Sequence, residues 1–264
     1  MMNSPRFHVI FRTCDVVHSL HNTPRPFNAD KKTLIKKCFL SLLESLEGID
    51  YTITVLGDKL SDEMVLFFRQ FPVTLTLGDW GNDESLRQSM KLAFDAPDED
   101  WVYLCEDDYL HSKQAFDWII DFIEHKDEYI TTKRFLTSIG IRNNLRKAPI
   151  VIHPPDYPDR YKAKYLRFSL IFLSRFCHWR QVTDTTFTFM AQGKTFKKYR
   201  SIFWNSCTGA NDRYLSKKLY AGVRFGSKAL CLSPMPGVAT HMHEEVMTPL
   251  VDWKARYDNI TVSK

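Results

Sequence analysis

The sequence predicts an α/β fold in one domain, with a mostly parallel central sheet flanked by helices and an irregular, basic C-terminal half. Over the first 130 residues, four short apolar segments alternate with segments whose apolar residues recur at helical spacing. This alternation is typical of a parallel sheet covered by helices. The composition agrees, because 264 residues with 44% hydrophobic and 14% aromatic side chains bury a large core and exclude a disordered chain.

A local sequence pattern predicts each helix and strand of the first half. The four strands are expected at residues 7–13, 51–56, 73–77 and 101–105, which are short, apolar and followed by polar or turn-forming residues. A helix over residues 30–47 has apolar residues at i, i+3 and i+4 spacing and ends at Gly48. The next helices have candidate first residues or caps in Ser61, in Asn82 or Asp83, and in Ser112.

The second half is less regular and carries the opposite charge. Residues 1–132 have a net charge of −10, whereas residues 133–264 have a net charge of +15. Strand is expected within 176–190 and over 229–232, and Asn211 can cap a helix over 212–220. An acidic half suits a cation, and a basic half suits phosphates, an anionic acceptor or a membrane surface. The alternative is that two complementary halves simply pack together.

Cysteine usage and apolar segments indicate the compartment. The six cysteines are scattered without a CxxC pair, which is typical of buried free thiols in a reducing environment. The N-terminus shows no secretory signal, and the most apolar window, residues 168–177, is shorter than the roughly 18 residues that a membrane span needs. We expect a cytoplasmic protein without a transmembrane segment, whose basic half allows peripheral contact with a membrane.

Three adjacent acids follow the fourth predicted strand. The carboxyl ends of parallel strands meet at one edge of a sheet, where ligands bind, and there we expect Glu106, Asp107 and Asp108. Adjacent carboxylates repel one another, and a divalent cation would relieve that repulsion. Glu106 and Asp108 point the same way on an extended chain, and their oxygens suit Mg²⁺ or Mn²⁺. The alternative is a solvated acidic turn.

A second cluster lies near the C-terminus. His241 and His243 lie on one side of an extended chain, and imidazoles can complete the shell of Mn²⁺ or Zn²⁺. The pattern is not HExxH, so a zinc hydrolase of that kind is not supported. Either histidine alone is better explained as a surface or core residue.

Asp212 opens a predicted helix directly after Asn211. A carboxylate in the first turn is stabilised in its charged form by the helix dipole. It could serve as a general base or simply cap the helix, and spacing alone leaves both open.

With these motifs in order, the chain resembles a GT-A-fold glycosyltransferase over most of its length. Glu106-Asp107-Asp108 resembles the DxD-type metal element of that family, and Asn211-Asp212 resembles the start of the helix whose Asp is the base of inverting members. The resemblance implies Mn²⁺ or Mg²⁺ ligands at Glu106, Asp108 and His241, with His243 as the rival. It implies substrate contacts at Thr13, Cys14, Asp15, Asp58, Asn82, Ser85, Gln88, Asp107, Arg180 and Asn211.

The resemblance also implies an activity. It is the metal-dependent transfer of a sugar from a nucleotide-diphosphate sugar, a UDP-sugar being favoured, to an acceptor hydroxyl deprotonated by Asp212. A single base of this kind fits inversion of the configuration at the anomeric carbon, and a retaining mechanism is not excluded. Residues 1–130 would hold the donor and residues 131–264 the acceptor, which could be a glycan, a lipid-linked sugar or a protein. No nucleic acid is expected as a partner.

Three alternatives remain from the sequence. A metal-dependent nucleotidyltransferase would also bind a nucleotide at this edge, but the loop over residues 16–30 lacks the glycines such enzymes use. A nucleic-acid-binding protein could use the basic half, although the acidic edge would repel phosphates. An inactive relative is the third, since Glu106 and Asn211 depart from the common motifs.

Overall fold

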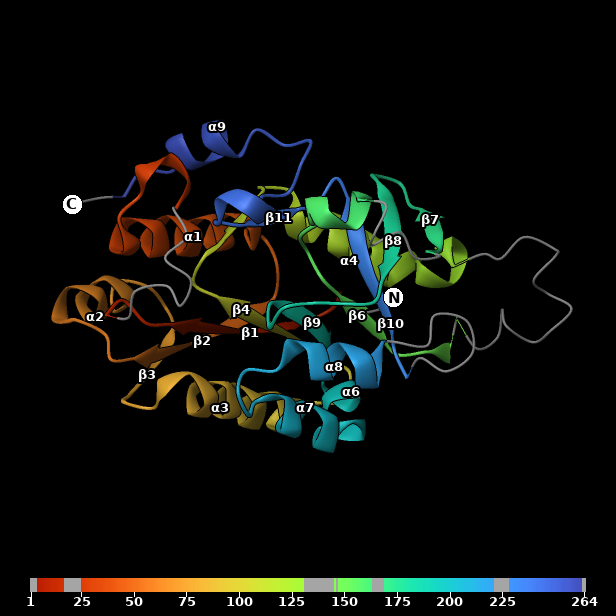
Figure 1. Cartoon of the computed structure of the whole chain (residues 1–264), viewed down its shortest axis with the longest axis horizontal. Helices are drawn as coiled ribbons and strands as arrows, with labels where there is room; N and C mark the ends of the chain where they lie inside the picture. The colour runs from red at the N-terminus through yellow and green to blue at the C-terminus, as the bar shows by residue number, and fades with distance from the viewer. Residues whose placement is uncertain are drawn as a thin grey trace, which may run out of the picture.

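One large sheet organises the molecule. The computed structural model describes residues 4–16, 25–130, 145, 147–162, 169–220 and 228–262. In that part of the chain, nine strands pair in the order β3-β2-β1-β4-β9-β6-β10-β8-β7 (Figure 1). They are β1 (Phe7–Thr13), β2 (Tyr51–Asp58), β3 (Thr74–Gly78), β4 (Trp101–Glu106), β6 (Ile150–Ile152), β7 (Ile171–Leu173), β8 (His178–Val182), β9 (Phe189–Gln192) and β10 (Leu230–Met235). The short strands β5 (Tyr109–His111) and β11 (Ala239–His241) pair antiparallel in a second sheet.

The strand order reverses next to β1. The chain runs outward from β1 to β2 and β3 and then returns to β4, so β1 is paired in parallel with both β2 and β4. Beyond β4, strands β9 and β8 run antiparallel to their neighbours, while β6 and β10 are parallel to each other. A crevice at the carboxyl ends of β1 and β4 is where such a topology places a ligand.

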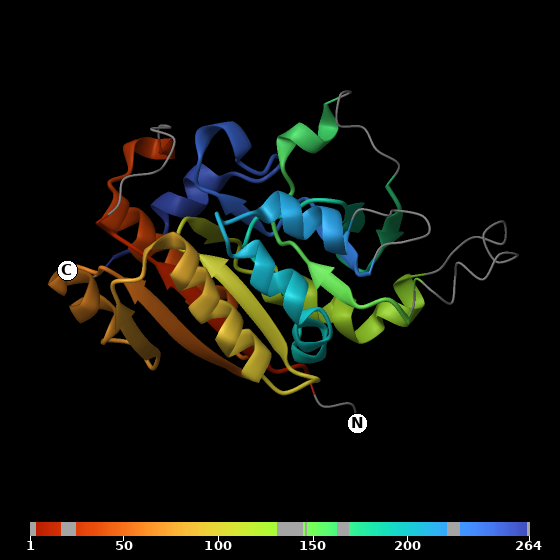
Figure 2. The ribbon, with the colours of Figure 1, turned by 60° about the horizontal axis from the view of Figure 1, so that its bottom comes forward.

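Helices cover both faces of the sheet. They are α1 (Lys31–Ser45), α2 (Asp62–Phe68), α3 (Gly81–Asp95), α4 (Ala115–Tyr129), α6 (Gly193–Lys198), α7 (Arg200–Ser206), α8 (Asp212–Leu219) and α9 (Trp253–Asp258), with 3-10 turns η1 (Pro26–Asn28), η3 (Pro158–Tyr161) and η5 (Glu244–Val246). Figure 2 shows α3 beside the parallel strands. Of the described helices, none is both long and apolar enough to cross a membrane.

Alternate side chains of β1 point to opposite faces of the sheet, so β1 contributes to the apolar core on both faces. Phe7, Val9 and Phe11 join the apolar cluster formed with α1, α2 and α4, whereas Ile10 joins the cluster formed with α3, α6, α7 and α8. A third cluster packs β5, α9 and Met242, the residue after β11, against α1. The α/β class and the mostly parallel, helix-flanked sheet predicted from the sequence are therefore confirmed.

Element boundaries follow the sequence less closely than element types. The strand expected within 176–190 is interrupted, since β8 ends at Val182 and β9 begins at Phe189. Helix α4 begins at Ala115, three residues after Ser112, and the predicted cap Asn211 does cap α8 by accepting from the N–H of Tyr214 at 2.8 Å. Within the basic segment 133–228, residues 133–144, 146, 163–168 and 221–227 lie outside the described residues, as do residues 17–24 of the loop over 16–30.

The predicted caps of α2 and α3 are corrected by contacts between elements. Ser61 does precede α2, but its N–H and hydroxyl bond the carboxylate of Asp15 and its side chain does not cap the helix. Asn82 and Asp83 lie inside the first turn of α3, which begins after Trp80. Asp58, at the end of β2, accepts the N–H groups of Trp80 at 2.6 Å and Gly81 at 3.0 Å, so a neighbouring strand satisfies the start of α3.

Removing the Asp58 carboxylate should destabilise the fold. Asp58→Ala leaves the N–H groups of Trp80 and Gly81 without their acceptor in a buried place, which should lower the free energy of unfolding by about 2 kcal/mol. The matched control is Asp79→Ala, because Asp79 is 78% exposed in an ion pair with Lys59, and its loss should cost less than about 1 kcal/mol. Urea unfolding followed by circular dichroism measures both, and equal losses would contradict the capping role.

Candidate functional site

Arg12 occupies the centre of the edge where β1 and β4 end. It lies opposite Glu106 in the β1–β4 register, and its guanidinium donates to Glu106 Oε1 at 2.7 Å. The same guanidinium donates to Asn82 Oδ1 at 2.7 Å and to Ser85 Oγ at 3.2 Å, at the start of α3. Sequence reasoning missed Arg12, although its place one residue before the end of the first predicted strand is a signal that could have found it.

Each of the three adjacent acids has its own partner in the fold. Glu106 is paired with Arg12, and its other oxygen accepts from the Thr188 hydroxyl at 3.3 Å. Asp107 accepts the Thr13 hydroxyl at 2.8 Å and the Cys14 N–H at 3.0 Å, which fixes the end of β1. The repulsion expected from the sequence is thus divided among three separate contacts.

The ionisation of these acids follows from burial and from those contacts. Burial raises the pKa of Glu106, against the opposing charge of Arg12, and burial together with the neighbouring Asp108 raises the pKa of Asp107. Burial would also raise the pKa of Asp108, but the His241 imidazole outweighs burial and lowers it. Asp108 is therefore the acid that most readily keeps its negative charge.

Asp108 and His241 meet across 133 residues of sequence. Strand β11 pairs with β5 so that His241 lies opposite Tyr109 and its ring stacks on the Tyr109 ring at 4.9 Å. Nε2 of His241 then donates to Oδ2 of Asp108 at 2.9 Å. Burial would lower the pKa of His241, but Asp108 raises it above its ordinary value. The ring of His243 is 5.7 Å from that of His241.

A small cavity of about 110 Å³ opens beside this pair. Its wall combines acids, imidazoles and two basic side chains, and consists of Arg25, Lys31, Leu34, Ile35, Asp107, Asp108, His241, Met242 and His243. Arg25 precedes η1 and Lys31 begins α1, so the basic side chains come from the segment that follows β1 along the chain. Basic side chains are the groups that bind phosphate oxygens in proteins, and carboxylates are common ligands of divalent cations.

The donor atoms here fit a divalent cation that also binds a ligand. Oδ1 of Asp108 is buried and has no hydrogen-bond partner among the described residues, and it adjoins the oxygen that contacts His241. Among those residues no group of three or more His, Cys, Asp or Glu side chains is arranged to hold a metal. Oδ1 of Asp108 suits Mg²⁺ or Mn²⁺ when water and phosphate oxygens complete the shell. His241 can join it only by releasing the Nε2 proton that it donates to Asp108. Glu106 is turned toward Arg12 in this arrangement.

Other residues predicted to contact substrate form structural contacts at the same edge. Both oxygens of Asp58 accept backbone N–H groups, Asp15 holds Ser61, and Gln88 donates to Glu84 at 2.7 Å on α3. Thr13, Cys14, Asn82 and Ser85 surround Arg12 and Asp107, as described above. Their contacts with a nucleotide stay predictions.

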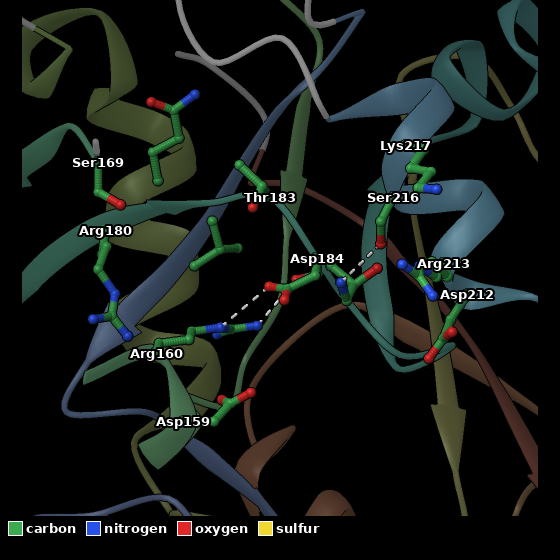
Figure 3. A pocket seen from close by; sticks show the side chains of 13 residues that line it. Asp159, Arg160, Ser169, Arg180, Thr183, Asp184, Asp212, Arg213, Ser216 and Lys217 are labelled. Atoms are coloured by element: carbon green, nitrogen blue, oxygen red, sulfur yellow. Dashed lines mark hydrogen bonds and ion pairs between the residues drawn. The ribbon is translucent and has the colours of Figure 1, made fainter. Parts of the chain in front are cut away.

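A larger cavity of about 560 Å³ contains Asp212. Figure 3 shows Asp212, Arg213, Ser216 and Lys217 on α8, across the cavity from Arg160 and Arg180. Burial raises the pKa of the Asp212 carboxyl above its ordinary value. A carboxylate with a raised pKa that lines a cavity has the chemistry of a general base.

The two cavities have no lining residue in common, but short contacts connect them. The loop between β8 and β9 lines the larger cavity at residues 183–185 and reaches Glu106 through Thr188. The loop before α8 donates the N–H of Gly209 to Asp83 at 2.7 Å, one residue after the Asn82 that contacts Arg12. Arg180 lines the larger cavity and is ion-paired with Asp156, so its contacts lie away from the Asp108 pair.

Comparisons with known proteins give distant structural similarity alone. No protein-family model matches the chain, and no curated protein matches it either. Similar solved structures include residues 1–349 of S. aureus TarS (12% identity, TM-score 0.45), a Methanothermobacter nucleotidyl transferase (11%, 0.41) and mouse xyloside xylosyltransferase 1 (11%, 0.39). They cover 86%, 86% and 85% of this chain, which spans 60%, 85% and 78% of theirs. Similarity at this level transfers no site residues.

Arg12 should stabilise the protein through Glu106 in a pH-dependent way. In Arg12→Gln, the partly buried Glu106 carboxylate loses its cation, and the free energy of unfolding should fall by about 1 to 2 kcal/mol at pH 7. The folded-state pKa of Glu106 is already raised and rises further in the variant. Protonation at lower pH removes the unpaired charge, so the difference from the wild type should shrink as the pH falls toward about 4.

The matched control for Arg12→Gln is Arg6→Gln. Arg6 precedes the same strand and pairs with Asp50 at 3.6 Å, with the two side chains 47% and 65% exposed. Its loss should change stability by less than about 0.5 kcal/mol at any pH. Urea unfolding at several pH values measures both variants, and a pH-independent loss in Arg12→Gln would argue against charge compensation at Glu106.

Proposed function

We propose that this protein is a transferase that binds a nucleotide-diphosphate sugar at the β1–β4 edge and transfers the sugar to an acceptor in the larger cavity. The observation that carries the proposal is the meeting of Asp108 and His241 beside Arg25 and Lys31, at the point where the strand order reverses. That combination suits a diphosphate with a divalent cation, and a UDP-sugar is the first donor to test.

The small cavity supports recognition of the diphosphate. Its 110 Å³ suits a phosphate group and not a whole nucleotide, so the base and sugar would extend from it along the edge of the sheet. Arg25 and Lys31 would attract the phosphates, and Asp108 and His241 would hold Mn²⁺ or Mg²⁺. When bound, the cation would neutralise the negative charge that builds up on the departing diphosphate.

Asp212 would act on the acceptor. Its carboxylate takes the proton of the acceptor hydroxyl, whose oxygen attacks the anomeric carbon as the bond from that carbon to the diphosphate oxygen breaks. The diphosphate leaves with the bonding electron pair. Attack from the face opposite the leaving group inverts the configuration. The raised pKa of Asp212 strengthens it as a base and makes the rate fall when the pH drops through that pKa.

Asp108 and His241 should both be needed for binding of the nucleotide. UDP with Mn²⁺ should raise the melting temperature of the wild type, because a ligand that binds only the folded state stabilises it. Asp108→Asn and His241→Gln should each weaken that binding about tenfold or more, the effect of losing one charge-assisted contact. Thermal shift as a function of UDP concentration, referenced to each variant without ligand, measures the affinity.

A second carboxylate–imidazole pair provides the control. His8 and Asp100 are 2.7 Å apart at the opposite end of the same two strands, so Asp100→Asn removes an equivalent charge away from the site. It should leave the affinity for UDP and Mn²⁺ unchanged. If the wild type shows no shift with any nucleotide and metal, or if Asp100→Asn loses binding equally, the assignment of the site is wrong.

Asp212→Asn should separate chemistry from binding. Release of nucleoside diphosphate from the donor should fall at least about 100-fold, the range of general-base catalysis, while the thermal shift with UDP and Mn²⁺ stays unchanged. Asp252→Asn is the control, because Asp252 accepts the N–H of Ala255 at 2.9 Å at the start of another helix, α9. Undiminished release of nucleoside diphosphate by Asp212→Asn would contradict the role of Asp212 as the general base. Release of pyrophosphate from a nucleoside triphosphate would instead indicate a nucleotidyltransferase.

A further inference from the structure

The basic side chains of the larger cavity differ in their partners. Arg180 is ion-paired with Asp156, and Arg160 contacts Asp184 at 3.5 Å. Arg213 and Lys217 form no side-chain hydrogen bond or ion pair within the described part of the chain. They are four residues apart on α8, so they face the same side of that helix, and Figure 3 shows both at the cavity wall. Both side chains are exposed, and neither is paired with the acids that line the same cavity, Asp159, Asp184 and Asp212.

Buried polar atoms in the same wall point to a ligand independently. Nε of Arg180 and Oε1 of Gln181 have no hydrogen-bond partner among the described residues, although the two residues are only 8% and 2% exposed. Buried polar groups are normally paired, and a bound molecule could supply both partners. Arg180 Nε needs an acceptor, such as an anionic oxygen, and Gln181 Oε1 needs a donor, such as a hydroxyl.

The composition of the wall narrows the class of ligand. Among its thirteen lining residues, Val182 is the only one with a purely hydrocarbon side chain, and none is aromatic. Hydroxyl, carboxylate and basic side chains surround the space and come from η3, Ser169, the segment from β8 to β9, and α8. A polar molecule with several hydroxyls fits this surface better than an apolar chain.

We propose that the larger cavity selects an acceptor sugar that carries an anionic group, a phosphate or a carboxylate, which Arg213 and Lys217 bind. Asp212, the residue before Arg213, then faces the hydroxyl that receives the transferred sugar. This inference rests on the proposed transferase function, but it concerns a different cavity from the one that binds the nucleotide. Arg213 and Lys217 thus determine which acceptor is bound.

Binding of simple sugars tests this proposal. Glucose 6-phosphate, glucuronate and glucose serve as probes in isothermal titration calorimetry, because they share a ring and differ in the anionic group. The wild type should bind at least one anionic probe about tenfold or more tightly than glucose. The better of the two anionic probes identifies the phosphate or the carboxylate. Arg213→Gln combined with Lys217→Gln should abolish the preference.

Lys218→Gln is the matched control. Lys218 lies on the same helix and is exposed, but it does not line the cavity and lies 5.9 Å from the Tyr214 ring. It should keep the preference of the wild type. Equal binding of glucose and both anionic probes, no binding of any probe, or an intact preference in the double variant would each overturn the proposal.

The failure of the proposed function would look different. The double variant should keep the thermal shift with UDP and Mn²⁺, because Arg213 and Lys217 lie outside the small cavity. A wild type that binds the anionic probe but shows no nucleotide-dependent shift would contradict the transferase and leave an anion-binding cavity. A nucleotide-dependent shift without preference for anionic sugars would contradict the acceptor class alone.

Discussion

The structure depends on how three consecutive carboxylates are tolerated at the end of one buried strand. Arg12 neutralises Glu106, the hydroxyl and N–H groups at the end of β1 hold Asp107, and His241 holds Asp108. Two of the three contacts therefore come from β1, the strand adjacent to β4, and the third from a strand near the C-terminus. Negative charge that would disrupt an isolated strand instead connects the end of β4 to β1 and β11 at a single edge.

Sheet topology makes this arrangement possible. Because the chain reverses its order next to β1, no covering helix directly connects the carboxyl ends of β1 and β4, and the space between them is available to a ligand. The opposite end of the same strands carries ion pairs as well, such as His8 with Asp100 and Arg6 with Asp50. The carboxyl end differs because its acids and imidazoles line a cavity together with Arg25 and Lys31, which supports the assignment of that end as the functional one.

The two cavities differ in the side chains that line them. The smaller combines a carboxylate–imidazole pair with Arg25 and Lys31 and matches a phosphate with its cation, whereas the larger combines Asp212 with several basic side chains and matches a polar acceptor. The β8–β9 loop connects their walls through Thr188 and Glu106. A transferase needs such a separation, because its donor and acceptor must approach one another from different sides.

The sequence by itself determined the types and order of the main elements of the first half and the gathering of polar residues at strand ends. Those features depend on local periodicity and on the shared edge of parallel strands. Only the tertiary structure decided that Arg12 neutralises Glu106, that Asp58 caps α3, that His241 contacts Asp108, and that Asp212 lines a separate cavity. These are contacts between segments far apart in sequence, and their partners depend on strand order and helix placement, which no local pattern encodes.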